Sequence, residues 1–166
     1  MKKFVLVCIV LFIANIGCKK SNIGGGGLCA CSPIVGPQLL LVIKNTVGED
    51  LLNDKTTGAY TKDKIALYRK DVEGKDIPVN FFIKPPFDYG NEKFSFNQLH
   101  ADNIGFVQKT TDKTLYLKLG DSKIYQLNIE LNQNSYSVEK VFINNKEAEK
   151  DKGNVAKVTT IFYLTE

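Results

Sequence analysis

The only histidine of the chain, His100, is the first residue to consider for chemistry, because any imidazole-based catalysis must use it. Asp102 lies two residues further on, and Ser95 and Ser122 are candidate nucleophiles. A serine triad depends on geometry rather than on sequence spacing, so these residues keep a hydrolase mechanism open. Neither serine lies in a Gly-x-Ser-x-Gly motif, however. We therefore expect His100 to be a solvated loop histidine rather than a catalytic base.

Three carboxylates around Gly74 form a weak candidate for a calcium site. Asp71, Glu73 and Asp76 lie close together in the sequence, and calcium favours clustered oxygen ligands in such loops. The segment is shorter than an EF-hand loop, and Lys75 opposes a bound cation. We expect the charged tip of a β-hairpin here, without a metal ion.

A second acidic region contains Glu49, Asp50 and Asp54. A pair of carboxylates can serve glycoside hydrolysis when the fold holds the two groups several ångströms apart. A carboxylate pair is therefore the alternative to His100 for an enzymatic function. Nothing in the spacing of these residues indicates such a pair, and we expect them to be turn residues.

Cys29 and Cys31 are the next chemical feature, since thiols of an exported protein tend to oxidise. Three fates are open for them: a strained bridge with each other, a bridge to another copy of the chain, or ligation of a soft metal. Two sulfurs make only half of a tetrahedral metal site. We expect an oxidised pair without activity.

Phe87 and Tyr89 lie in the segment Pro85–Gly90, which two prolines stiffen. Exposed aromatic rings on a rigid loop can stack on a sugar ring or anchor a protein partner. The alternative is that both rings fold back and plug one end of the domain. We expect the plug, and we keep the loop as a candidate ligand contact.

The first 17 residues have the pattern of an export signal. Lys2 and Lys3 give a positive start, and the segment 4–17 is apolar apart from Asn15. The 14 residues of this segment are too few to span a bilayer core, which needs about 20 helical residues. The pattern is typical of a secretory signal.

The end of this signal, Asn15-Ile16-Gly17-Cys18, resembles a lipobox, the site at which bacterial lipoproteins are lipidated and cut. The resemblance implies a thioether-linked diacylglycerol on Cys18, cleavage before it, and acylation of the new amino group. Two or three acyl chains would hold the protein firmly on a membrane. The whole chain resembles small uncharacterised lipoproteins of the Bacteroidota. This resemblance implies a lipid-anchored protein of the bacterial cell envelope, at the outer membrane, with a periplasmic or surface face left open.

Residues 18–37 are expected to form a flexible tether. Four consecutive glycines, Gly24–Gly27, are costly to order. As a random coil, the tether would hold a domain on the order of 25 Å from the lipid. The sequence thus divides into a signal peptide at 1–17, the lipidated cysteine and tether at 18–37, and a β-sandwich domain at 38–166.

Strand patterns run through the body of the chain. The apolar run Leu39–Ile43 is typical of a strand buried on both faces. Residues 115–119 and 125–131 alternate apolar and polar side chains, and the turn residues between them indicate a hairpin. Further strands are expected at 65–68, 79–83, 136–143 and 158–164.

Two local signals refine this pattern. The apolar parity changes between Val138 and Val141, which predicts a β-bulge. Asn144-Asn145 favours a hairpin turn, because asparagine tolerates positive φ. We find no long amphipathic helix. The chain is therefore predicted to be an all-β, immunoglobulin-like antiparallel β-sandwich, with a small β-barrel as the alternative.

Composition narrows the function. The formal net charge of +4 falls by two if Lys2 and Lys3 leave with the signal. Basic residues are spread along the chain, which argues against a nucleic-acid partner. We expect no cofactor. The expected function is a non-enzymatic binding or structural module for an envelope protein or glycan; the alternative is an envelope hydrolase that uses His100 or a carboxylate pair.

Overall fold

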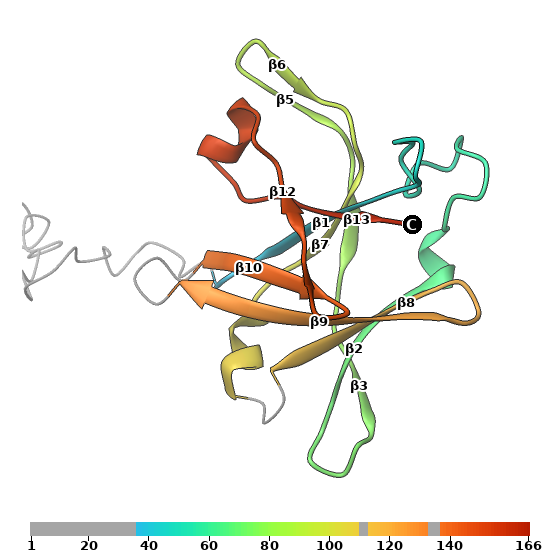
Figure 1. Ribbon diagram of the computed structural model, residues 1–166, viewed down its shortest axis with the longest axis vertical. Helices are drawn as coiled ribbons and strands as arrows, with labels where there is room; N and C mark the ends of the chain where they lie inside the picture. Colours follow the sequence, from blue (N-terminus) through green and yellow to red (C-terminus); the bar gives the residue numbers. More distant parts are fainter. Residues whose placement is uncertain (1–35, 110–112, 133–136) are drawn as a thin grey trace, which may run out of the picture. The chain divides into compact units, whose positions relative to one another are not determined.

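The computed structural model describes residues 36–109, 113–132 and 137–166. The signal peptide 1–17 and most of the tether 18–37 lie outside the described residues. Figure 1 shows the described part as two β-sheets, one short hairpin and a few short 3₁₀ turns. No helix in this part of the chain is long and apolar enough to cross a membrane.

The first sheet is built around β1 (Leu39–Lys44), the apolar run that opens the domain. β1 pairs in parallel with the last strand, β13 (Phe162–Thr165), and antiparallel with β7 (Gln98–Ala101). Its edges are β12 (Glu149–Lys150) and β4 (Phe82–Lys84), which gives the order β12-β13-β1-β7-β4. The first five side chains of β1 are all buried, so the prediction of a strand buried on both faces is confirmed.

The second sheet has the order β11-β10-β9-β8-β2-β3, and its strands pair antiparallel. The hairpin predicted from the alternating side chains is formed by β8 and β9. The alternation arises because one face packs on the other sheet while the opposite face meets solvent. The strands are β2 (Ile65–Lys70), β3 (Asp76–Pro78), β8 (Thr114–Leu119), β9 (Lys123–Asn132), β10 (Ser137–Ile143) and β11 (Lys146–Glu147).

Both local predictions for this sheet are confirmed. The register of β10 against β9 shifts between Val138 and Lys140, as a bulge requires. Asn144 and Asn145 turn the chain from β10 into β11 with φ values of 49° and 66°. This left-handed conformation is one that asparagine adopts more readily than most residues.

Apolar side chains from the two sheets meet in one main core. The first sheet contributes Leu41, Leu99 and Phe162, and the second contributes Leu117 and Leu127, all fully buried. Two packed sheets around such a core form an all-β sandwich, as predicted, and its strands pair antiparallel except for the parallel pair β1–β13. The sheets are open, with distinct edge strands, so the alternative small barrel is not formed by the described residues.

The outer face of the first sheet carries a second, smaller core. The hairpin of β5 (Phe87–Tyr89) and β6 (Glu92–Phe94) contributes to it, as does the 3₁₀ turn η3 (Asn154–Lys157). Leu40 and Val42 of β1 pack against these segments. Because apolar groups cover this face as well, the side chains on both faces of β1 can be apolar.

The chain changes sheets at both edges of the sandwich. At one edge it leaves β3 at Pro78 and enters β4 at Phe82, and at the other Ala148 separates β11 from β12. The prediction of a single strand over 79–83 is therefore wrong. Its apolar residues lie where the chain crosses from one sheet to the other. Their side chains are partly buried there, although the backbone does not form a continuous ladder of hydrogen bonds.

The last predicted strand is also too long. β13 begins only at Phe162, because the chain leaves η3 at Val158, whose side chain is 56% exposed. The remaining 3₁₀ turns of the described chain, η1 (Lys62–Lys64) and η2 (Ile104–Lys109), precede β2 and β8.

Candidate binding cleft

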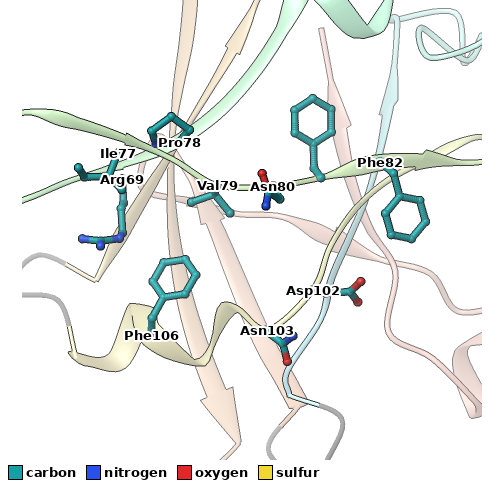
Figure 2. A pocket seen from close by; sticks show the side chains of 10 residues that line it. Arg69, Ile77, Pro78, Val79, Asn80, Phe82, Asp102, Asn103 and Phe106 are labelled. Atoms are coloured by element: carbon teal, nitrogen blue, oxygen red, sulfur yellow. The ribbon is translucent and has the colours of Figure 1, made fainter.

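Two connections between the sheets lie near each other at the edge of the sandwich formed by β3 and β4 (Figure 2). One is the crossing 79–81 between β3 and β4, and the other is the segment that leads from β7 through η2 to β8. Between them lies a cleft of about 600 Å³. This volume falls within the range of small-ligand sites, about 300–1,000 Å³.

Arg69, the only arginine of the chain, lies at one end of this cleft. It follows the buried Leu67 by two positions on β2, so it occupies the core-facing side of the strand. Its guanidinium carbon is 5.5 Å from the ring centroid of Phe106, a cation–π contact. Within the described chain, no carboxylate pairs with Arg69. Its hydrogen-bond donors are therefore available to an anion from outside.

Asp102 lines the cleft away from Arg69, on the side of Phe82. The Oδ1 atom of Asp102 lies 2.9 Å from His100 Nε2. The contact is close but not aligned as a hydrogen bond, and His100 Nδ1 has no partner among the described residues. The imidazole packs against Phe82 with ring centroids 4.5 Å apart, and its side chain is 11% exposed. His100 is thus a buried residue of β7, and the prediction of a solvated loop histidine is wrong.

Burial also sets the charge of His100. Desolvation of the imidazole lowers its pKa below the usual 6.5, and the positive charge of Lys84 acts in the same direction. The carboxylate of Asp102 raises the pKa but does not outweigh these two effects. At neutral pH the imidazole is uncharged, so Asp102 gives this end of the cleft its negative charge.

Asn103 fixes the wall that carries Asp102. Its φ is 53°, and it packs so tightly on Gly36 that any Cβ there would collide with the Asn103 side chain. The backbone N–H of Ile104 donates to the carbonyl of Pro37 at 3.0 Å. The segment before β1 thus holds this wall in place, and the amides of Asn103 and Asn80 line the cleft.

The remaining walls of the cleft are apolar. Ile77, Val79 and Phe81 are partly buried, whereas Phe82 is 42% exposed. Apolar walls with a few convergent polar groups are the usual composition of a ligand site. The cleft is therefore suited to a ligand that combines an apolar group with an anionic group at the arginine end.

The cleft does not assemble the catalytic residues considered from the sequence. Ser95 follows β6 and Ser122 lies in the turn after β8, and neither lines the cleft. None of the described residues that line it carries a hydroxyl or a thiol. His100 does not line the cleft itself and contacts two residues that do, Asp102 and Phe82. The site therefore holds an imidazole–carboxylate contact without a nucleophile.

The residues considered for calcium shape the hairpin between β2 and β3. Asp71 Oδ1 accepts hydrogen bonds from the backbone N–H groups of Glu73 and Lys75, both at 2.9 Å. Asp76 pairs with Lys70 at 3.2 Å. In the described part of the chain, no three His, Cys, Asp or Glu side chains are grouped closely enough to hold a metal ion.

The acidic residues of the second region, Glu49, Asp50 and Asp54, lie in loops, and two of them accept hydrogen bonds that stabilise turns. Asp50 is buried, and its Oδ1 accepts a hydrogen bond from Leu52 N–H at 2.9 Å. Its Oδ2 accepts from the backbone N–H and the side-chain amide of Asn97, at 2.7 and 2.8 Å. Glu49 accepts a hydrogen bond within its own turn, and Asp54 lies further along the same loop. Asp50 therefore links two loops.

The two aromatic residues of the proline-stiffened segment differ in their surroundings. Phe87 is partly buried and stacks on Phe94, with ring centroids 5.5 Å apart. Lys84 Nζ lies 4.5 Å from the centroid of the Phe87 ring. Tyr89 is 47% exposed. The expectation that both rings fold back therefore holds for Phe87 alone, which packs on the outer face of the first sheet.

A further charged cluster surrounds Glu166, whose side chain is 8% exposed. Its carboxylate accepts hydrogen bonds from the hydroxyls of Tyr60 and Tyr125, at 2.5 and 2.6 Å, and from Lys123 Nζ at 3.1 Å. Burial by itself would raise the pKa of Glu166, but these three donors together hold it below the usual 4.5. Burial and the bond to Glu166 raise the pKa of Tyr125 to about 12. The cluster joins the end of β13 to the second sheet.

Cys18, Cys29 and Cys31 lie outside the described residues. Lipidation of Cys18 therefore stays a prediction, and so does the oxidised state of the other two. The cleft is the feature that sequence reasoning missed, because its walls come from segments far apart in the chain. One signal was present: the only arginine stands two positions after an inward-facing leucine of a strand. Comparisons of the chain with protein-family models, with curated proteins and with solved structures find no match.

Proposed function

We propose that this protein is a lipid-anchored lipoprotein of the bacterial outer membrane whose sandwich domain is a non-enzymatic binding module. The observation that supports this function best is the cleft, which combines an arginine that has no carboxylate partner among the described residues with apolar and aromatic walls. Its partner belongs to the envelope and is a protein or a glycan. The lipid on Cys18 and the tether 18–37 would keep the domain close to that partner.

The construction of the cleft supports a binding role. Its two walls are connections between sheets, and binding residues are commonly carried on loops that a rigid scaffold positions. Here the scaffold is the main core, whose central side chains are fully buried. Arg69 on β2 and Phe106 on η2 already contact each other. A ligand would therefore meet a preformed site.

Cross-linking in the native envelope tests the binding function. The intact lipoprotein is cross-linked to its neighbours, purified and compared with Arg69→Gln and with Lys75→Gln. Lys75 is an exposed cation at the tip of the β2–β3 hairpin, away from the cleft lining, and serves as the matched control. We expect a cross-linked partner that is lost in Arg69→Gln and kept in Lys75→Gln. A partner that survives both changes would show that the cleft is not the binding site.

The anchor is tested separately by metabolic labelling with a palmitate analogue. We expect label on the wild-type protein and none on Cys18→Ala. Equal label on both proteins, or no label on either, would refute lipidation at Cys18.

The second candidate function is an envelope hydrolase, and the contact between His100 and Asp102 is the observation in its favour. Both ring nitrogens of His100 are buried, however, and a general base needs to reach the proton it removes. Turnover of envelope peptides or glycans by the purified protein, abolished in Asp102→Asn, would support the hydrolase over the binding module.

A further inference from the structure

We propose that the cleft binds the carboxyl-terminal end of an extended peptide whose last side chain is apolar. The proposal rests on the cleft being the binding site and names the class of its partner. The terminal carboxylate would meet Arg69, the last side chain would pack against Phe106, and the preceding residues would extend toward Asp102.

The carboxylate is inferred from Arg69. Arg69 is partly buried, in cation–π contact with Phe106 and without a carboxylate partner in the described chain. A planar guanidinium can bind a carboxylate through two parallel hydrogen bonds, and the contact with Phe106 holds it beside the cleft. A neutral sugar would leave this charge without a counter-ion.

The apolar last residue is inferred from the walls. Ile77, Val79 and Phe106 provide aliphatic and aromatic surface near Arg69, with no hydroxyl among the described lining residues. A sugar carries many hydroxyls, and each needs a hydrogen-bond partner when it is buried. The lining offers chiefly two side-chain amides and one carboxylate in addition to Arg69. An apolar side chain therefore fits these walls better than a sugar ring.

The extended conformation is inferred from the sheet edges beside the cleft. β4 is the last strand of the first sheet, and no described strand pairs with its outer side. An unpaired edge can take an added strand from a peptide partner. β3 is the corresponding edge of the second sheet, but Pro78 lacks an N–H donor there. The peptide would therefore add to β4, next to the exposed Phe82.

The charges of the cleft fix the direction of the peptide. Arg69 and Asp102 lie on opposite sides of the crossing residues Val79 and Asn80 (Figure 2). With the carboxylate at Arg69, the upstream residues run toward Asp102. A lysine or arginine of the peptide two or three positions before its end would meet that carboxylate, so peptides with such a residue should bind more tightly.

A peptide array tests the proposal on the full-length protein in detergent. The probes are hexapeptides with randomised last three positions, each made as a free acid and as a carboxyl-terminal amide. We expect binding of free acids that end in Val, Leu, Ile or Phe, and at least tenfold weaker binding of the matching amides. Equal binding of acids and amides by the wild-type protein would overturn the proposal without the need for a variant.

Two variants and a second probe separate the outcomes. Arg69→Gln should abolish the preference for acids, while Lys75→Gln should keep it, with thermal unfolding of both proteins as the folding control. Should acidic oligosaccharides bind in an Arg69-dependent way while the peptides do not, the peptide proposal fails and the binding function stands. If neither probe binds and cross-linking finds no Arg69-dependent partner, the peptide proposal and the proposed binding function both fail.

Discussion

At the scale of single residues, Glu166 shows how a buried carboxylate can be stabilising. Removing water from a charge is costly, and the cost is recovered only when hydrogen bonds replace that water. Two tyrosine hydroxyls and the ammonium of Lys123 supply those bonds here.

We predict that Glu166→Gln lowers the free energy of unfolding by about 2 kcal/mol at pH 7, since charge-assisted hydrogen bonds are lost. The folded-state pKa of Glu166 lies below 4.5, so its contribution is present above that pH and is lost as the pH falls through the lowered folded pKa. Urea denaturation of both proteins at pH 7 and at low pH measures this. A difference that stays constant with pH would contradict the prediction.

His100 offers a second test at this scale, because a lone histidine gives a single set of imidazole signals. The folded-state pKa is lowered by burial, so stability linked to His100 is present above pH 6.5 and is lost as the pH falls through the lowered pKa. We predict an NMR titration midpoint below 6.5. Asp102→Asn should lower the midpoint further, because the carboxylate that favours the imidazolium is gone. A midpoint at or above 6.5 in the wild-type protein would refute the burial of the ring.

At the scale of elements, the connections between sheets determine the site. The close approach of Asn103 to Gly36 helps to hold the segment after β7 in position. The backbone Cα of Asn103 would lie only 3.2 Å from a Cβ at position 36. A Cβ at position 36 would therefore displace the Asn103 side chain and press on its backbone, which belongs to the wall of the cleft.

We predict that Gly36→Ala destabilises the protein by about 1–3 kcal/mol through overpacking. Asn103→Gly should be nearly neutral, because glycine accepts a φ of 53° without strain. In the double variant, Asn103→Gly should recover part of the loss, which thermal unfolding of all four proteins would measure as a coupling energy. Additive losses would mean that the two residues do not interact.

The sequence was most informative for features that neighbouring residues specify by themselves. The β8–β9 hairpin, the bulge near Val138 and the Asn144-Asn145 turn were all predictable, because local geometry alone dictates them. The crossing at 79–81 was not, because an apolar run has the same appearance within a strand and between two sheets. The burial of His100 was also not predictable, because it depends on a contact with Phe82, which lies in a neighbouring strand.

At the scale of the whole molecule, the first and last strands of the domain lie side by side. Leu41 of β1 faces Phe162 of β13 in a parallel pair at the centre of the first sheet. Both side chains are fully buried in the main core. The first sheet and the main core are therefore incomplete until both β1 and β13 are present.

We predict that deletion of residues 162–166 abolishes cooperative folding. The deletion removes the neighbour of β1 and the carboxylate of Glu166 together, and it exposes the edge of β1. Far-ultraviolet circular dichroism and limited proteolysis should show an unfolded, protease-sensitive chain. A sharp unfolding transition in the shortened protein would contradict this prediction.

The pairing of β1 with β13 has a consequence for biogenesis. A chain that is threaded through a membrane from its amino end delivers β1 first and β13 last, so five consecutive apolar residues wait for their neighbour until translocation ends. Contacts between such distant segments slow folding, and an apolar strand with an unpaired edge is prone to aggregate in the meantime. For the proposed exported lipoprotein, a chaperone that covers β1 until the last strand arrives would limit this aggregation.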